Sequence, residues 1–228
     1  MMLRKAVVLS ALLSPLALFA QGCQSGGVGD PCIPEDEYLP NFGGFAASEV
    51  NIESRSFQCE TRVCLVNHFR GRVTCPIGQS EATAKRITEL LAKEATAALG
   101  AAEQEELVAL RKVATACRIP GSSGKNADLV RAPVFGQCSK RPDKLAVYCS
   151  CRCDGADKGA KYCECPNGFA CRPFKELDVG AAVAKGSAQL GGSYCVKEED
   201  PGFAESSCGS GVDECTAENK KCGVTANP

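Results

Sequence analysis

Cysteine is the residue type with which this chain can do the most chemistry. The sequence holds 17 cysteines in 228 residues, with three Cys-x-Cys spacings: Cys149 with Cys151, Cys151 with Cys153, and Cys163 with Cys165. Thiolates that alternate along one face of a strand could converge on a soft metal ion such as Zn²⁺ or Cu⁺. In an oxidising compartment the same cysteines would form disulfides instead.

The spacing favours disulfides over a metal site. The sequence contains no Cys-x-x-Cys, which is the commoner spacing of zinc knuckles and ribbons. The two members of a Cys-x-Cys pair rarely bond to each other because the ring is strained, so each should reach a different strand. We predict no metal ion and no cofactor. Thiolate binding of zinc or copper by the cluster of residues 149–171 is the alternative.

Sixteen of the cysteines are predicted to form disulfides. They are Cys32, Cys59, Cys64 and Cys75 in an N-terminal group, Cys117, Cys138, Cys149, Cys151, Cys153, Cys163, Cys165 and Cys171 in a dense middle group, and Cys195, Cys208, Cys215 and Cys222 in the tail. Each group has an even number of members and could pair internally, although spacing selects no connectivity.

The sequence contains no recognisable catalytic motif. His68 is the only histidine, and the sequence contains no Gly-x-Ser-x-Gly, His-Glu-x-x-His or Walker A pattern. The net charge of −1 supplies no basic field for nucleic acid. We therefore predict that the protein is not an enzyme and does not bind nucleic acid.

The N-terminus has the pattern of an export signal. Arg4 and Lys5 precede an apolar stretch at residues 6–20. Fifteen helical residues span about 22 Å, less than the roughly 30 Å hydrocarbon core of a bilayer. Residues 1–22 are therefore predicted to be a signal peptide rather than a transmembrane helix.

The end of this segment resembles the bacterial lipoprotein box, in which the chain is cut before an acylated cysteine. Ala20 and Gly22 are the small residues at the −3 and −1 positions of a cut before Cys23. Because the number of cysteines is odd, at least one cannot form an intramolecular disulfide. Lipid on Cys23 would allow the other sixteen to pair. In enterobacterial lipoproteins a residue other than Asp after this cysteine directs the protein to the outer membrane, so the resemblance implies that sorting for a chain with Gln24. We predict that Cys23 carries the lipid that anchors the protein to the membrane; soluble secretion is the alternative.

The elements that must position the cysteines differ along the chain. From Ser80, a plausible N-cap, apolar residues recur with helical period to Cys117, interrupted at Gly100. This pattern predicts a helical hairpin or one long helix over residues 80–117. Cys75 and Cys117 are expected to pin its ends. Its apolar stripe is expected to pack within the protein, with docking of a partner helix as the alternative.

Short strands are predicted elsewhere. Residues 63–66 and 72–75 flank a turn and predict one hairpin. Residues 145–153 alternate with period two, and residues 162–165 would return after a turn to form a second hairpin.

These features predict a small disulfide-rich fold, mostly β or irregular, with an inserted helical element. The expected organisation is a signal peptide at 1–22, a lipid-anchored tether at 23–31 and an N-terminal Cys-rich module at 32–79. It continues with the helical insertion at 80–117, a dense Cys-rich β-hairpin module at 118–172 and a loop-rich tail at 173–228.

Three stretches resemble cysteine-rich exported proteins and lipoproteins of myxobacteria and their relatives. They are GDPCIP at residues 29–34, SRSFQCETRVCL at 54–65 and YCSCRCDG at 148–155. The resemblance implies export and a disulfide architecture, and it implies no activity. The predicted function is therefore a lipid-anchored, disulfide-stabilised protein of the cell envelope, of structural or binding type, whose protein or ligand partner the sequence does not name.

Overall fold

A computed structural model describes residues 26–96, 99–113, 115–123, 128–173, 191–198 and 215. The predicted signal peptide, Cys23, Cys208 and Cys222 lie outside these residues. Within the described part of the chain, no helix is both long and apolar enough to cross a bilayer.

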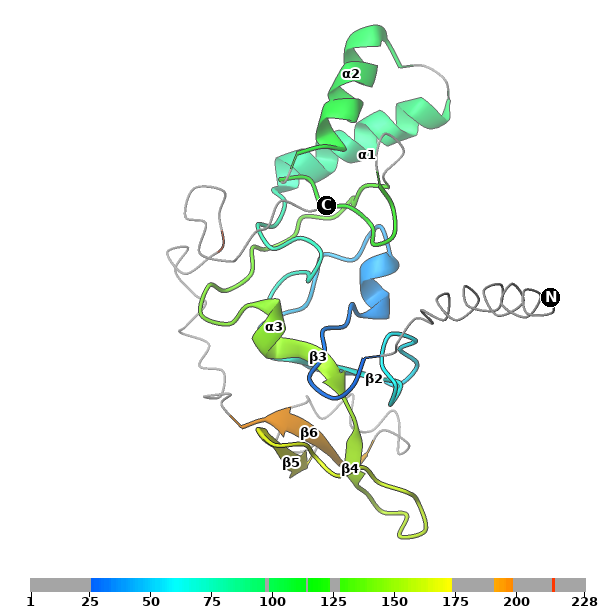
Figure 1. Ribbon diagram of the computed structural model, residues 1–228. Helices are drawn as coiled ribbons and strands as arrows, with labels where there is room; N and C mark the ends of the chain where they lie inside the picture. Colours follow the sequence, from blue (N-terminus) through cyan, green and yellow to red (C-terminus); the bar gives the residue numbers. More distant parts are fainter. Residues whose placement is uncertain are drawn as a thin grey trace, which may run out of the picture.

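The described residues form two three-stranded antiparallel sheets and a few helices. In chain order the elements are η1 (Glu35–Tyr38), β1 (Val50–Glu53), β2 (Val63–Asn67), α1 (Glu81–Ala95), α2 (Ala101–Leu110), α3 (Asp143–Ala146), β3 (Val147–Ser150), β4 (Arg152–Asp154), β5 (Phe169–Pro173) and β6 (Ser193–Lys197). The strand orders are β1-β2-β3, here called the core sheet, and β4-β6-β5, here called the disulfide sheet. In Figure 1 helices α1 and α2 lie at one end of the molecule and the disulfide sheet lies at the other.

The core sheet is buried on both faces. All five residues of β2 are buried, and the first four alternate between two apolar clusters. Val63 and Leu65 pack with Tyr148 of β3 and with residues of β6. Cys64 and Val66 face a second cluster that contains Phe45, Phe69 and Cys149. This double burial explains why β2 reads as a continuous apolar run rather than as an alternating one.

Helices α1 and α2 occupy the segment for which the sequence predicts helix. Ser80 caps α1, since its Oγ accepts a hydrogen bond from the Thr83 amide at 3.1 Å. Ile87 and Leu90 of α1 are fully buried against Leu107 of α2. Three ion pairs also join the helices: Arg86 with Glu106 at 2.6 Å, Lys93 with Glu103 at 2.5 Å, and Arg111 with Glu94 at 3.1 Å.

The first predicted hairpin is wrong. Strand β2 pairs with β1 and β3 and not with residues 72–75. Residues 72–75 form a tight turn instead, with the Cys75 amide donating to the Arg72 carbonyl at 3.3 Å. The physical reason is the Arg72 side chain, which is fully buried beside Glu37 of η1 and draws this segment away from β2.

The second predicted hairpin is also wrong. Residues 162–165 form no strand, and β4 pairs instead with β6 through Arg152 and Tyr194. Strand β6 also pairs with β5, where Cys171 lies opposite Cys195. The sequence predicts only a loop-rich tail at residues 173–228 and does not indicate β6, which becomes the central strand of the disulfide sheet.

Candidate functional site

Every described cysteine is disulfide-bonded. Six bridges join Cys32 to Cys64, Cys59 to Cys149, Cys75 to Cys117, Cys151 to Cys163, Cys153 to Cys171, and Cys165 to Cys195. Cys138 and Cys215 are bonded as well, which brings the number of bonded cysteines to 14. The predicted Cys208 and Cys222 disulfides and the Cys23 lipid lie outside the described residues.

The internal pairing of the three cysteine groups is wrong. Cys59–Cys149 joins the first group to the middle group, and Cys165 joins the middle group to Cys195 of the tail. The reason is that β3 pairs with β2 and β6 pairs with β4, so segments far apart in sequence lie side by side. In contrast, no Cys-x-Cys pair bonds to itself, as the sequence predicts. Cys75–Cys117 joins the two ends of the helical segment, as expected.

Three of the bridges lie against one another on the disulfide sheet. Their six cysteines, here called the sulfur cluster, are Cys151, Cys153, Cys163, Cys165, Cys171 and Cys195. The Sγ atom of Cys195 lies 3.5 Å from that of Cys151 and 3.7 Å from that of Cys163. On the other side, the sulfurs of Cys153, Cys165 and Cys171 all lie within 4.8 Å of one another.

The sulfur cluster contains two triads whose three sulfurs lie within 4.8 Å of one another, near enough for one metal ion if they were free. Cys151, Cys163 and Cys195 form one, and Cys153, Cys165 and Cys171 form the other. A metal ion needs deprotonated thiolates, and all six sulfurs are engaged in disulfides. Metal binding here would therefore require prior reduction.

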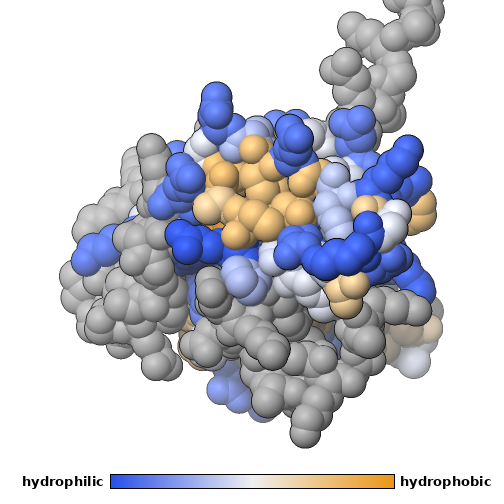
Figure 2. Space-filling model, turned by 90° about the horizontal axis from the view of Figure 1, so that it is seen from below, coloured by the Kyte–Doolittle hydropathy of each residue, from blue (hydrophilic) through white to orange (hydrophobic). Residues whose placement is uncertain are grey.

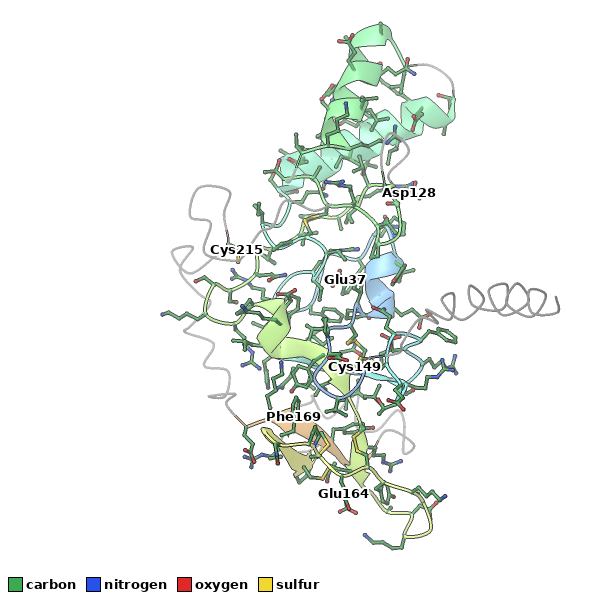
Figure 3. All side chains as sticks on the ribbon, viewed as in Figure 1. Glu37, Asp128, Cys149, Glu164, Phe169 and Cys215 are labelled. Atoms are coloured by element: carbon green, nitrogen blue, oxygen red, sulfur yellow. A yellow bond between two sulfur atoms is a disulfide. The ribbon has the colours of Figure 1, made fainter. Side chains whose placement is uncertain are left out.

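The sulfur cluster lies at an accessible end of the protein. Cys171 is exposed, whereas Cys151 and Cys195 are buried at 3% and 0% exposure. Seen from this end, the surface carries a hydrophobic patch ringed by hydrophilic residues (Figure 2). Glu164 lies in the loops beside this sheet, and Cys149 of the core sheet lies further into the molecule (Figure 3).

A second candidate is a groove beside the start of α1. Its volume is about 990 Å³, and its walls come from residues 43–48, 77–81 and 133–136, with Arg70 at its side. The Arg70 Nε donates to the Gly136 carbonyl at 3.1 Å, and the guanidinium lies 5.7 Å from the ring centroid of Phe135. Phe135 is 69% exposed, so an aromatic side chain borders the groove.

Glycine lets the walls of this groove approach each other. At Gly78, where φ is 79°, an added Cβ would lie 2.4 Å from the Val134 carbonyl oxygen. The neighbouring Gln79 and Val134 exchange backbone hydrogen bonds at 2.8 and 2.9 Å. No local pattern in the sequence indicates the groove, because its glycines lie far apart along the chain and come together only in the fold.

A buried ion pair is a third cluster of chemically capable residues. The Glu37 carboxylate accepts hydrogen bonds from the amides of Val73 and Thr74 at 2.6 and 3.0 Å and from the Thr74 hydroxyl at 2.6 Å. Burial raises the pKa of Glu37, and these hydrogen bonds together with the Arg72 charge oppose that rise. Both side chains are fully buried and bond to neighbouring backbone, so this pair fastens η1 to the following loop.

His68 belongs to none of these clusters, although it contacts Ala47 in the wall of the groove. It is half-buried, with a positive φ of 51° and its Nδ1 3.1 Å from the Ala47 carbonyl oxygen.

Comparison with known proteins assigns none of these sites. No protein-family model, no curated protein and no solved structure matches the chain. The resemblance to myxobacterial exported proteins therefore stays a prediction from the three quoted stretches.

Proposed function

We propose that the protein is a lipid-anchored, disulfide-stabilised component of a bacterial cell envelope, with a structural or binding role and no catalytic activity. The observation that supports this most strongly is that all 14 described cysteines are bonded. Such complete pairing is typical of exported proteins, because reducing compartments keep thiols free.

Cysteine parity supports acylation of Cys23. Of the 17 cysteines in the chain, 14 are described and bonded, and the other three, Cys23, Cys208 and Cys222, lie outside the described residues. Lipid on Cys23 would leave the other two to pair with each other, so that no thiol remains free. This favours a lipoprotein over a secreted protein, and Gln24 after the cut favours its sorting to the outer membrane.

The helical segment fits an insertion that the disulfides tie to the rest of the protein. We propose that residues 80–117 form a helical hairpin closed by Cys75–Cys117. The buried contact of Ile87 and Leu90 with Leu107 and the three ion pairs between α1 and α2 support this arrangement.

The groove is the surface best suited to a binding role. Its walls expose backbone and small side chains, and Phe135 offers an aromatic contact at its edge. A ligand there would meet one cationic side chain, Arg70, and one anionic side chain, Glu81.

Metabolic labelling with a fatty acid tests the anchor. Wild-type protein should take up labelled palmitate and fractionate with membranes. Cys23→Ser should lose the label and become soluble, whereas the control Cys208→Ser should keep the label. Absence of label from the wild type would refute the lipid anchor and favour soluble secretion.

Thiol and metal analysis of the purified protein separates the scaffold from the metal-binding alternative. The scaffold predicts no titratable thiol in denaturant without reductant, and no change of the circular dichroism spectrum with a chelator. Several titratable thiols with stoichiometric zinc or copper would instead support a metal site at residues 149–171.

A further inference from the structure

The central bridge of the sulfur cluster contacts a different disulfide at each of its ends. Its buried end, Cys195 Sγ, lies 3.5 and 3.7 Å from the two sulfurs of Cys151–Cys163. Its outer end, Cys165 Sγ, lies within 4.8 Å of both sulfurs of Cys153–Cys171. Thiol–disulfide exchange needs only a thiolate that can reach a disulfide sulfur, and reduction of any one bridge would provide such a thiolate beside the next.

The three bridges differ in solvent exposure, which determines the one that a reductant reaches first. Cys171 is exposed and Cys153 is half-buried, so a reductant from solvent reaches this bridge first. Cys163 and Cys165 are half-buried, whereas Cys151 and Cys195 are buried at 3% and 0% exposure.

We propose that the sulfur cluster is a thiol–disulfide exchange site, in which a dithiol attacks the exposed bridge and the reduction passes inward through the central one. The substrate class is a dithiol, such as a small dithiol or the reduced active site of a dithiol protein. This exchange consumes one protein disulfide for each dithiol and so is a stoichiometric reaction, not catalytic turnover. It goes beyond the structural or binding role and needs no lipid anchor.

The steps balance in atoms and electrons. A thiolate of the dithiol attacks Cys171 Sγ, and the electron pair of the broken bond leaves on Cys153 Sγ. The Cys153 thiolate attacks Cys165 Sγ and displaces the Cys195 thiolate. Cys195 then attacks Cys151 Sγ and displaces the Cys163 thiolate.

The second thiol of the dithiol completes the reaction. It attacks the mixed disulfide, forms the cyclic disulfide of the reductant and releases Cys171 as a thiolate. Two protons from the dithiol end on Cys171 and Cys163. The dithiol is thereby oxidised by two electrons, and three protein disulfides become two, Cys153–Cys165 and Cys151–Cys195, plus two thiols. Attack of Cys195 on Cys163 Sγ instead would leave Cys151 as the second thiol.

The two bridges at the core sheet provide an internal control. Their sulfurs lie equally close together, but solvent does not reach them. The sulfurs of Cys32, Cys59 and Cys149 also lie within 4.8 Å of one another. These residues and Cys64 are at most 2% exposed, so a solvent thiol has no bridge there to attack first. We expect Cys32–Cys64 and Cys59–Cys149 to survive a dose of reductant that rearranges the sulfur cluster.

Limited reduction of the fully oxidised protein tests the proposal. About one equivalent of dithiothreitol is added, the reaction is quenched with acid, free thiols are alkylated, and disulfide-linked peptides are mapped by mass spectrometry. The expected products carry a new Cys153–Cys165 bridge, with alkylation at Cys171 and at Cys163 or Cys151. In the variant Cys165→Ala/Cys195→Ala, alkylation should be confined to Cys153 and Cys171.

The proposal can be tested even if that variant folds poorly, because the disulfide map of the wild-type protein is sufficient to support or refute it. Loss of native bridges without any rearranged bridge in the wild type would overturn the proposal. Alkylation of Cys151 or Cys163 in a folded variant would also overturn it, since solvent thiol would then reach the inner bridge directly. The remote variant Cys75→Ala/Cys117→Ala should give the wild-type map.

Discussion

The two sheets have the same number of strands and the same antiparallel pairing, but different interactions stabilise them. Every residue of β2 in the core sheet is buried, and apolar clusters cover both of its faces. In the disulfide sheet, β5 is half-buried or exposed along its whole length, and three bridges hold β4, β5, β6 and the adjoining loops together. The core sheet also has bridges, at Cys64 and Cys149, but it adds them to its apolar clusters. A sheet that cannot bury enough apolar area needs covalent links instead.

Strand β6 of the disulfide sheet also packs against the core sheet. Tyr194 and Val196 pack in the same apolar cluster as Leu65 of the core sheet. Ser150 Oγ donates to the Cys195 carbonyl at 2.7 Å, and the Lys197 amide donates to the Tyr148 hydroxyl at 3.2 Å. The disulfide sheet is therefore anchored to the core through its central strand and depends on sulfur at its edges.

The largest expected effect is on the core sheet. Leu65→Ala removes a fully buried side chain from the centre of β2 and should lower the free energy of unfolding by about 2–5 kcal/mol. Urea denaturation of the oxidised protein, followed by circular dichroism, measures the change. The control Leu145→Ala removes a side chain that is 44% exposed and should cost much less. Equal losses from the two variants would contradict the assignment of the main apolar core to β2.

A smaller and more local effect is expected when a bridge of the disulfide sheet is removed. Cys153→Ala/Cys171→Ala opens a bridge with a sequence separation of 18, for which chain entropy predicts a loss of up to about 3 kcal/mol. Hydrogen exchange should speed up in β4 and β5 and remain slow in β2. If hydrogen exchange speeds up to the same extent in both sheets, they unfold as one unit, and the proposed difference in what stabilises them is wrong.

The smallest expected effect is a pH dependence to which two carboxyl groups at β1 of the core sheet contribute. Burial raises the pKa values of Glu49, just before β1, and of Glu53, at its end. Above the ordinary value of 4.5, the unfolded chain releases protons that the folded protein still holds. Stability should therefore decline as pH rises from 4.5 through these raised values.

Glu53→Gln should flatten this decline, because glutamine can still accept the hydrogen bond from the Glu35 amide without ionising. Thermal denaturation between about pH 4.5 and pH 8 measures the slope. Asp154→Asn in the disulfide sheet is the matched control. A hydrogen bond from the Gly155 amide and the Lys158 side chain lower the pKa of Asp154, which is therefore already ionised throughout this range. A steeper slope for Glu53→Gln than for the wild type would contradict the assignment.

Local signals in the sequence determined the parts of the fold that depend on neighbouring residues. The helical period from Ser80 and its cap predicted α1, because capping and a buried stripe involve residues only three or four apart. The strain of a Cys-x-Cys ring predicted that no such pair closes on itself. The cysteine count predicted a disulfide scaffold, as the 14 bonded cysteines show.

Only the tertiary structure decided which strands pair and which cysteines bond. The alternation at residues 145–153 correctly placed Val147 and Cys149 on one face, but nothing in it identifies β2 as the partner of β3. The Cys59–Cys149 bridge spans 90 residues, and it forms because β2 brings the two segments together. The groove likewise depends on Gly78 meeting Val134. The periodicity of apolar residues shows which face of a helix or strand is buried. Which strands pair and which cysteines bond depends on how all of these buried faces pack together in the folded chain.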